Sequence, residues 1–376
     1  MASAEKYIEQ RLNERRIVGS YRILKPENNL IDFCSNDYLG FSRSSALKNK
    51  INEEINSNHL VLNGATGSRL ISGNLNYTEE LEKEIAKLFN SEAGLLFNSG
   101  YDANLGLLSS LPQRGDTIIT DELIHASIID GARLSHANRY TFKHNDIAGL
   151  EAKLKQAKGN CYVVIESVYS MDGDSPPIIE LLDITEKYGA HLIVDEAHAV
   201  GLYKTGIITR LKLEKRVFAR IVTFGKALGC HGAVVLGNNL LREYLINFAR
   251  SFIYTTAAPL HQLASIKMAC ILLHKSAEEI TALQNNINLF KQMLTASKTY
   301  PLINSESPIQ CILLKSNEWA KKTAMHLQDN GLDVRAILSP TVAQGSERIR
   351  ICLHAFNTVN DLELLTNTIN NLLYAG

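Results

Sequence analysis

One lysine near the middle of the chain stands out for its chemical potential. Lys226 follows the apolar run 220–224, and its neighbours Gly225, Ala227 and Gly229 are small enough to let a flat ring approach the backbone. Most lysines are solvated surface residues, but an amine placed after a buried strand can act as a nucleophile toward a carbonyl group. The small neighbours favour this chemical interpretation.

Polar residues also follow the two apolar runs that precede this lysine in the chain. The run 191–194 is followed by Asp195 and, three residues further on, by His198, and the run 161–165 leads to Ser170. In an open α/β sheet, ligands bind outside the carboxyl ends of the strands. We therefore expect these three side chains to share one pocket with the lysine.

A lysine and a buried aspartate are the usual protein contribution to pyridoxal phosphate chemistry. Asp195 follows Leu-Ile-Val and should be nearly buried, which is costly for a carboxylate without a partner. It is suited to hold the pyridine nitrogen protonated, and His198 could reach the ring hydroxyl. The alternatives are a helix cap or a core ion pair for Asp195 and a structural role for His198.

A phosphate site is predicted where the segment 98–104 follows the strand 94–97 and begins an apolar helix. Free backbone N–H groups and the helix dipole bind anions at such a place. A helix cap without a ligand is the alternative. Thr223 and the pair Thr255-Thr256 could donate hydroxyl groups to the same phosphate.

Two further groups suit the ring and an amino acid substrate. His125, after the strand 117–120, offers an imidazole that can lie face-on to the ring. Arg348 and Arg350 fall on the same side of one strand, and arginine forks match carboxylates bidentately. A salt-bridged surface is the alternative for these arginines.

The elements that must position these residues alternate between strands and helices, which predicts an α/β fold with a mostly parallel sheet. Seven strands are expected for this sheet, at 93–97, 117–120, 139–142, 162–165, 192–194, 221–224 and 233–236. A long helical stretch is expected from Pro259 to about Leu294, and a smaller α+β domain after it. The predicted domains are an N-terminal segment 1–45, a large cofactor domain 46–270 and a C-terminal domain 271–376.

Composition excludes several classes of function. The chain has 376 residues, 45% of them hydrophobic and 21% charged, with a formal net charge of zero and no basic stripe, so we expect no nucleic-acid partner. It shows no apolar signal region and no membrane-length apolar run, which predicts a cytoplasmic protein without a membrane span. Its six cysteines are scattered without a C-x-x-C pair, which favours reduced thiols and no metal site.

Taken in order, the motifs resemble those of the α-oxoamine synthases, a pyridoxal-phosphate family of the type I transferase fold. The resemblance covers nearly the whole chain, and its motifs are specific as an ordered set. They lie at 35–40, 67–73, 98–101, 125–127, 166–174, 194–198, 223–226, 340–342 and 348–350.

The resemblance implies roles for individual positions. Lys226 would carry the cofactor covalently, His125 would stack on its ring, and the ring nitrogen and hydroxyl would be held by Asp195, His198 and Ser170. The phosphate side would be formed by Gly100, Tyr101 and Thr223, and the substrate side by Arg22, Asn36 and Arg350. Thr256 would reach the phosphate of a neighbouring subunit, which implies a homodimer with shared sites.

The implied reaction joins an amino acid to an acyl thioester with loss of carbon dioxide. In it, the freed lysine would move the α-proton, a task that requires its pKa to be lowered by burial and neighbouring charge. The compact length and the segments 19–22 and 143–146 are most similar to the branch that joins L-alanine to a pimeloyl thioester in biotin synthesis. The acyl carrier would be coenzyme A or a carrier protein.

Several features leave the substrate open. Branches that use glycine or serine share most of the motifs, and Thr78 stands where the family often has a histidine. The glycine-rich segment 63–68 and the thinned glycines in 199–206 also depart from the family pattern. A type I aminotransferase or lyase without a thioester substrate is a second interpretation. A non-catalytic paralogue is a third, against which the presence of Lys226 argues.

Overall fold

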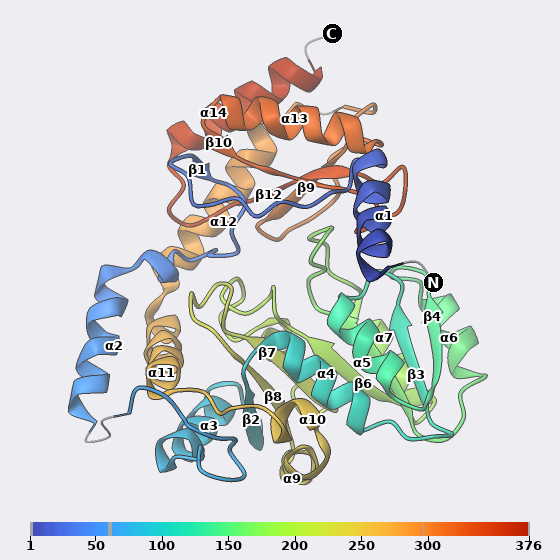
Figure 1. The fold of residues 1–376 in the computed structure, drawn as a ribbon, viewed down its shortest axis with the longest axis vertical. Coiled ribbons are helices and arrows are strands. Elements are labelled where there is room, and N and C mark those ends of the chain that lie inside the picture. The colour runs from blue at the N-terminus through green and yellow to red at the C-terminus, as the bar shows by residue number, and fades with distance from the viewer. Residues whose placement is uncertain (1–2, 59–61, 296, 375–376) are drawn as a thin grey trace. The chain divides into compact units, whose positions relative to one another are not determined.

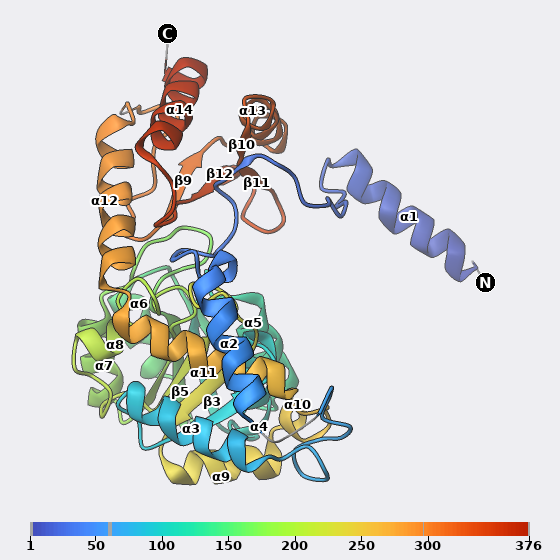
Figure 2. The same cartoon turned by 90° about the vertical axis from the view of Figure 1, so that its left-hand side faces the viewer.

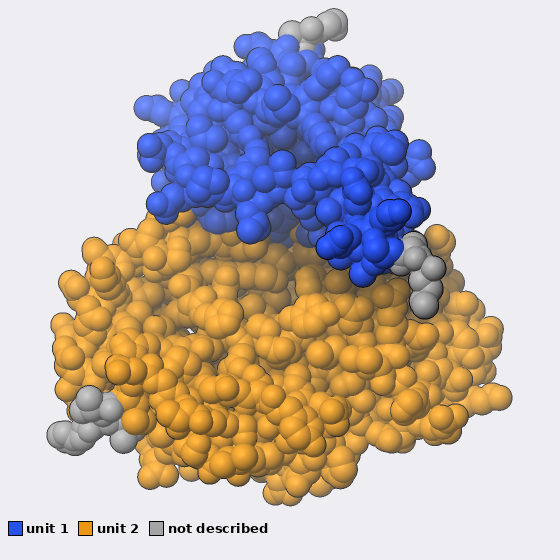
Figure 3. Space-filling view, viewed as in Figure 1, with its two compact units in different colours: residues 1–35, 171–174, 282–376 blue, residues 36–170, 175–281 orange. Residues whose placement is uncertain are grey.

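The computed structural model describes residues 3–58, 62–295 and 297–374, and the chain divides into two compact units (Figure 3). The larger unit comprises Asn36–Ser170 and Ser175–Thr281, and the smaller unit comprises Met1–Ser35, Met171–Asp174 and Ala282–Gly376. These limits fall at 35 and 281, whereas the sequence suggested boundaries at 45 and 270. The functional domain limits stay a prediction.

A seven-stranded sheet forms the centre of the larger unit (Figure 1). Only β8 runs in the direction opposite to the other six strands, so the predicted, mostly parallel seven-stranded sheet is confirmed. Its order is β2 (Ala93–Phe97), β8 (Ala233–Gly237), β7 (Ala219–Thr223), β6 (His191–Asp195), β5 (Cys161–Glu166), β3 (Thr117–Asp121) and β4 (Asn138–Phe142).

The apolar runs form strands because helices cover them. All residues of β2, β3 and β5 are buried, as expected for strands covered on both faces, and the polar side chains of β3 and β5 lie mainly at the strand ends. The core of the unit includes Leu107 and Ile193. Its helices are α2 (Ser45–Ser57), α3 (Asn76–Leu88), α4 (Gly100–Ser110), α5 (Ala126–Leu134), α6 (Ile147–Leu154), α7 (Ile178–Lys187), α8 (Ile207–Arg210), α9 (Asn239–Phe248), α10 (Arg250–Ile253) and α11 (Leu260–Lys275).

Helix packing within this unit follows the apolar faces of the helices. In α3, Leu81 and Ile85 are buried on one face of the helix, next to Phe89. Helix α4 packs on α5, and α2 packs along α11, as Figure 2 shows. The α4–α5 pair matters for the site because both helices begin at the carboxyl ends of strands, α4 after β2 and α5 after β3.

The helical stretch predicted after Pro259 is present but is interrupted once. It is two helices, α11 and α12 (Ala277–Met293), separated at Ser276. The Ser276 hydroxyl donates to the carbonyl of Leu273 at 2.8 Å and so competes with the helical hydrogen bonds.

The smaller unit is α+β, as predicted. Its three-stranded antiparallel sheet has the order β11 (Arg335–Ile337), β12 (Arg348–Cys352), β9 (Ile309–Leu313), and a parallel pair joins β1 (Ile31–Asp32) to β10 (Leu332–Asp333). Its helices are α1 (Ala4–Ile17), α13 (Asn317–Asp329) and α14 (Val359–Ile369), together with most of α12. In the described part of the chain, no helix is long and apolar enough to cross a bilayer.

Candidate active site

Lys226 lies in a tight loop that joins β7 to β8, at the carboxyl end of β7. Backbone hydrogen bonds close this loop from Gly229 N to Lys226 O (2.8 Å) and from Cys230 N to Phe224 O (2.9 Å). Gly229 adopts a left-handed φ of 62°, and a Cβ there would lie 2.2 Å from the backbone nitrogen of Ser42. The loop therefore requires glycine at this position. Its closed conformation fixes the backbone position of Lys226, whose side chain is half-buried.

The lysine amine is held by a chain of hydrogen bonds within the larger unit. Lys226 Nζ lies 2.8 Å from His198 Nε2, and His198 Nδ1 lies 2.8 Å from the Tyr38 hydroxyl. The same hydroxyl donates to Asn36 Oδ1 at 3.0 Å, so its oxygen accepts from His198 Nδ1. This leaves His198 Nε2 as the acceptor for the lysine. Three predicted residues, Asn36, His198 and Lys226, are thus brought together.

Asp195 ends β6 and is 5% exposed. Its Oδ1 accepts from the Ala197 backbone N–H at 2.9 Å, and its Oδ2 accepts from Asn104 Nδ2 at 2.8 Å. The residues that follow Asp195 form turns, and the next helix begins only at Ile207, so Asp195 is not a helix cap. Among the described residues it has no ion-pair partner either, and its negative charge is available to a ligand.

Two residues that the sequence analysis missed connect Asp195 to His125. Asn104 donates both to Asp195 and, at 3.0 Å, to the hydroxyl of Ser127, which lies 2.8 Å from His125 Nδ1. The signal in the sequence is weak: Asn104 is a polar residue on the apolar face of α4, and only its contact partners reveal its role. The network fixes the aspartate and the imidazole relative to each other.

His125 itself is the N-cap of α5 and receives the backbone N–H of Ser127 on Nδ1. Its side chain remains accessible to solvent. Partial desolvation by the surrounding protein lowers the pKa of His125, while the charge of Asp195 opposes this shift. The imidazole is therefore neutral at pH 7, with the proton on Nε2, and can present its face to a flat ring.

The start of α4 is the place where the sequence predicts a phosphate cradle. Ser99 caps the helix by accepting from Asp102 N at 3.1 Å, and a Cβ on Gly100 would lie 2.4 Å from Thr223 Oγ1. The strand β7 and the helix α4 thus approach each other closely only because residue 100 is a glycine. Tyr101 lies on the same turn, but its hydroxyl is exposed and donates to Asp130 Oδ2 at 2.6 Å.

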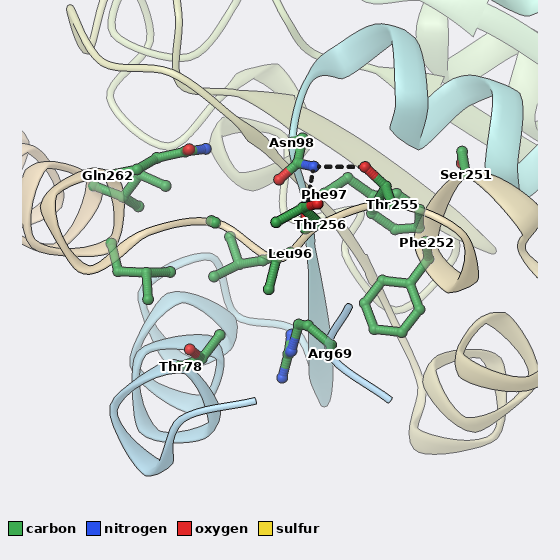
Figure 4. Close-up of a pocket in the computed structure, with 14 residues that line it drawn as sticks. Arg69, Thr78, Leu96, Phe97, Asn98, Ser251, Phe252, Thr255, Thr256 and Gln262 are labelled. Carbon is green, nitrogen blue, oxygen red and sulfur yellow. Dashed lines mark hydrogen bonds between the residues drawn. The ribbon is translucent and has the colours of Figure 1, made fainter. Parts of the chain in front are cut away.

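Asn98, the first residue of the predicted phosphate segment, lines a pocket that is drawn in Figure 4. Asn98 Nδ2 donates to Thr255 Oγ1 at 3.1 Å and to the carbonyl of Thr256 at 2.9 Å. The side chain of Thr256 is exposed, and Thr78, which replaces the common family histidine, lines the same pocket. Of the positions that the sequence analysis connected with the phosphate, the pocket therefore contains Asn98, Thr255 and Thr256, whereas Gly100 and Thr223 do not line it.

Glu166 ends β5 opposite Asp195 of β6 and received no role in the sequence analysis. It is 3% exposed, and its Oε2 accepts the backbone N–H of the buried Ser170 at 3.2 Å. Burial and the neighbouring charge of Asp195 raise the pKa of Glu166 to about 8. This carboxyl group holds the loop of Ser170, the residue predicted to contact the ring hydroxyl.

The remaining predicted residues belong to the smaller unit. Arg348 is buried and pairs with Asp172 at 2.5 Å, so it is engaged within its own unit. Arg350, also buried, donates to Cys352 Sγ at 3.0 Å, and Arg22 donates to Thr341 Oγ1 at 3.2 Å. The roles of Arg22 and Arg350 in substrate binding stay predictions.

The residues of the larger unit fit pyridoxal phosphate. Lys226 supplies an amine for its aldehyde, and Asp195 supplies a buried carboxylate with no cation partner among the described residues, suited to the pyridine nitrogen. The space that a Cβ on Gly100 would fill lies at a helix start whose backbone N–H groups suit a phosphate.

Comparison with known proteins identifies the family. The chain belongs to the aminotransferase class I and II family, whose sequence model matches residues 28–369. It is 43% identical to an 8-amino-7-oxononanoate synthase of Emericella nidulans, over 90% of this chain and 88% of the relative.

Solved structures agree with this placement. The crystal structure of an 8-amino-7-oxononanoate synthase from Francisella tularensis matches with a TM-score of 0.77 and 30% identity, covering 92% of this chain and 98% of the other. A serine palmitoyltransferase from S. paucimobilis matches with a TM-score of 0.88 and 24% identity, covering 98% of both chains, which shows the fold alone. The predicted resemblance to the α-oxoamine synthases and the predicted fold are thus confirmed.

Proposed function

We propose that this chain is a pyridoxal-phosphate-dependent acyltransferase of biotin synthesis. It joins L-alanine to a pimeloyl thioester, releases carbon dioxide and the free thiol, and forms 8-amino-7-oxononanoate. The observation that carries this proposal is the Lys226 amine, held 2.8 Å from His198 at the carboxyl end of β7 in a chain of this family. The names of relatives with 43% and 30% identity support the choice of substrates.

The cofactor, when bound, accepts the electron pair that bond breaking leaves on the α-carbon of the amino acid. Lys226 would hold it covalently, Asp195 would face its ring nitrogen, and the turn at Gly100 with Thr223 would bind its phosphate. Ser170 would face the ring hydroxyl, and His125 would lie against the ring. The Tyr101 hydroxyl donates to Asp130, so Tyr101 would contact the phosphate through its backbone N–H and not through its hydroxyl.

Proton movement falls to Lys226. Its Nζ would take the α-proton of the amino acid and would return a proton at the end of the reaction. His198 Nε2 accepts a hydrogen bond from Nζ and so orients the lone pair that receives the proton. The Tyr38 hydroxyl fixes the tautomer of His198 by accepting from Nδ1. Each carboxylate oxygen of Asp195 accepts one N–H donor, from Ala197 and from Asn104, which orients the group toward the site.

The covalent attachment can be tested directly. Purified protein incubated with pyridoxal phosphate and reduced with borohydride should carry the label on the peptide that contains Lys226. Lys226→Ala should remove the label, whereas Lys215→Ala, a change at an exposed lysine of the same unit, should retain it. A label at another residue would contradict the proposed site.

The substrates require a separate experiment. The loaded enzyme is given pimeloyl-CoA with alanine, glycine or serine, and thiol release and product mass are measured. Alanine should give the fastest thiol release. Preference for glycine with acetyl-CoA, or for serine with palmitoyl-CoA, would assign a sister activity. Amino-group transfer to a 2-oxo acid without thiol release would assign an aminotransferase.

We further propose a cytoplasmic homodimer with shared active sites. The exposed side chain of Thr256 is consistent with a residue that reaches the phosphate in a neighbouring subunit. The molar mass in solution should be twice that of the chain, and Thr256→Val should weaken cofactor binding without changing that mass. Comparing pimeloyl-CoA with the pimeloyl-carrier protein as substrate would identify the acyl donor.

A further inference from the structure

Two carboxyl groups lie side by side at the carboxyl end of the central sheet. Glu166 of β5 and Asp195 of β6 are register partners on adjacent parallel strands, which are separated by about 4.8 Å. Their side chains are 3% and 5% exposed. Two negative charges at this separation in a buried place repel each other strongly, so one group of such a pair retains its proton.

The hydrogen-bond partners show which group is charged. Asp195 receives one N–H donor on each oxygen, from Ala197 and Asn104. Glu166 receives one donor, the Ser170 backbone N–H at 3.2 Å, and its Oε1 is buried without a hydrogen-bond partner in the described part of the chain. Because donors stabilise the ionised form, the arrangement favours the charge on Asp195.

The other groups around Glu166 do not reverse this preference. Lys226, in the loop after β7, and the backbone amides of His125 and Ser170 favour the ionised form of Glu166. Burial and the charge of Asp195 act in the opposite direction and are the two largest contributions, so together they raise the pKa of Glu166.

We propose that Glu166 is a positioning residue that holds a proton next to Asp195, so that the pair carries a single negative charge, located on Asp195. The proposal deepens the proposed function, because it explains how the aspartate facing the ring nitrogen stays charged beside a second carboxyl group. It also gives the neutral carboxyl group a task, since its Oε2 fixes the backbone of Ser170. Ionisation of Glu166 would disturb both sides of the ring site.

The protonation state can be measured without the cofactor. The infrared spectrum of the apo protein at pH 6.5 should contain a carbonyl band of a protonated carboxylic acid that is absent in Glu166→Gln. This band should disappear as the pH rises through about 8. Glu82→Gln is the matched control, because Glu82 is equally buried but ion-paired with Arg69 and Arg242, and this change should leave the band in place.

Asp195→Asn serves as a second variant, independent of any folding defect in Glu166→Gln. Removing the neighbouring charge should shift the disappearance of the Glu166 band to lower pH. An unchanged titration, or identical spectra of wild type and Glu166→Gln, would overturn the proposal.

Cofactor binding provides the second readout. Above the pH at which Glu166 ionises, the wild type should bind pyridoxal phosphate more weakly, whereas Glu166→Gln should not. The Kd of the wild type divided by the Kd of Glu166→Gln should therefore rise by roughly tenfold per pH unit in this range. A constant ratio at all pH values would indicate a merely structural residue and refute the positioning role. If neither protein binds the cofactor, the proposed function fails, while the infrared result still decides the state of Glu166.

Discussion

Breaking one buried ion pair next to Asp195 is expected to destabilise the larger unit strongly. Glu196 follows Asp195 directly and pairs with Arg220 of β7, with the closest atoms, Oε2 and Nη2, 2.6 Å apart and side chains 0% and 2% exposed. Arg220 also donates to the carbonyls of Phe89 and Thr205. We expect Glu196→Ala to leave the guanidinium buried without its counter-charge.

The size of this effect follows from burial. Removing one partner of a buried pair costs about 3–5 kcal/mol, whereas an exposed pair contributes less than about 1 kcal/mol. Glu186→Ala is the matched control, because Glu186 pairs with Arg216 while both side chains are partly exposed, at 43% and 36%. Adding Arg220→Met to Glu196→Ala should recover part of the loss by removing the uncompensated charge.

Urea unfolding followed by far-ultraviolet circular dichroism measures these differences. The only tryptophan, Trp319, belongs to the smaller unit, so its fluorescence does not monitor the larger one directly. Glu196→Ala should lower the urea midpoint by roughly 1 M and Glu186→Ala by much less. Equal midpoints for the two variants would refute the reasoning. Because Asp195 precedes Glu196, the first variant should also bind pyridoxal phosphate more weakly.

Three further predictions concern other parts of the structure. Gly100→Ala places a Cβ 2.4 Å from Thr223 Oγ1 and should weaken pyridoxal phosphate binding about tenfold in a fluorescence titration, unless the cradle lies elsewhere. Asn104→Leu removes a donor from Asp195 and should destabilise the larger unit by about 1–3 kcal/mol in urea; no change would exclude the proposed network. Burial alone would raise the pKa of Asp32, but hydrogen bonds from Ser35 together with other contacts lower this pKa to about 2. Because the unfolded value is 3.8, the ionised Asp32 stabilises the folded protein above pH 3.8, and this stabilisation is lost as the pH falls toward 2. Asp32→Asn should therefore lower Tm at pH 6, by the equivalent of about 1 kcal/mol after solvent screening, and have little effect at pH 2.

The sheet and the lysine site could be predicted because their signals are local. Each strand is a short apolar run, and the residues with chemical potential follow these runs directly, so the topology of parallel strands places them together. The chain of contacts from Lys226 through His198 to Tyr38 and Asn36 agrees with that expectation. The roles of the individual residues in catalysis await the experiments above.

What the sequence could not predict depends on contacts between distant residues. Asn104 and Asp195 are 91 positions apart, and Arg220 and Glu196 are 24 apart, and neither pair belongs to a recognisable motif. The break at Ser276 was missed because its cause is a side chain that competes for a backbone carbonyl. Glu166 was overlooked because its raised pKa depends on Asp195, which lies on the neighbouring strand.

The reversed direction of β8 has a consequence for the mobility of the catalytic amine. Residues 224–232, which carry Lys226, connect β7 to its sheet neighbour β8, so both ends of this segment are fixed by the same sheet and backbone hydrogen bonds restrain its peptide groups. Any displacement of the amine between attachment and release of a bound molecule must come from rotations of the four-carbon stem alone. Inserting one residue into this loop would shift Lys226 relative to His198, although every side chain of the pocket would be unchanged.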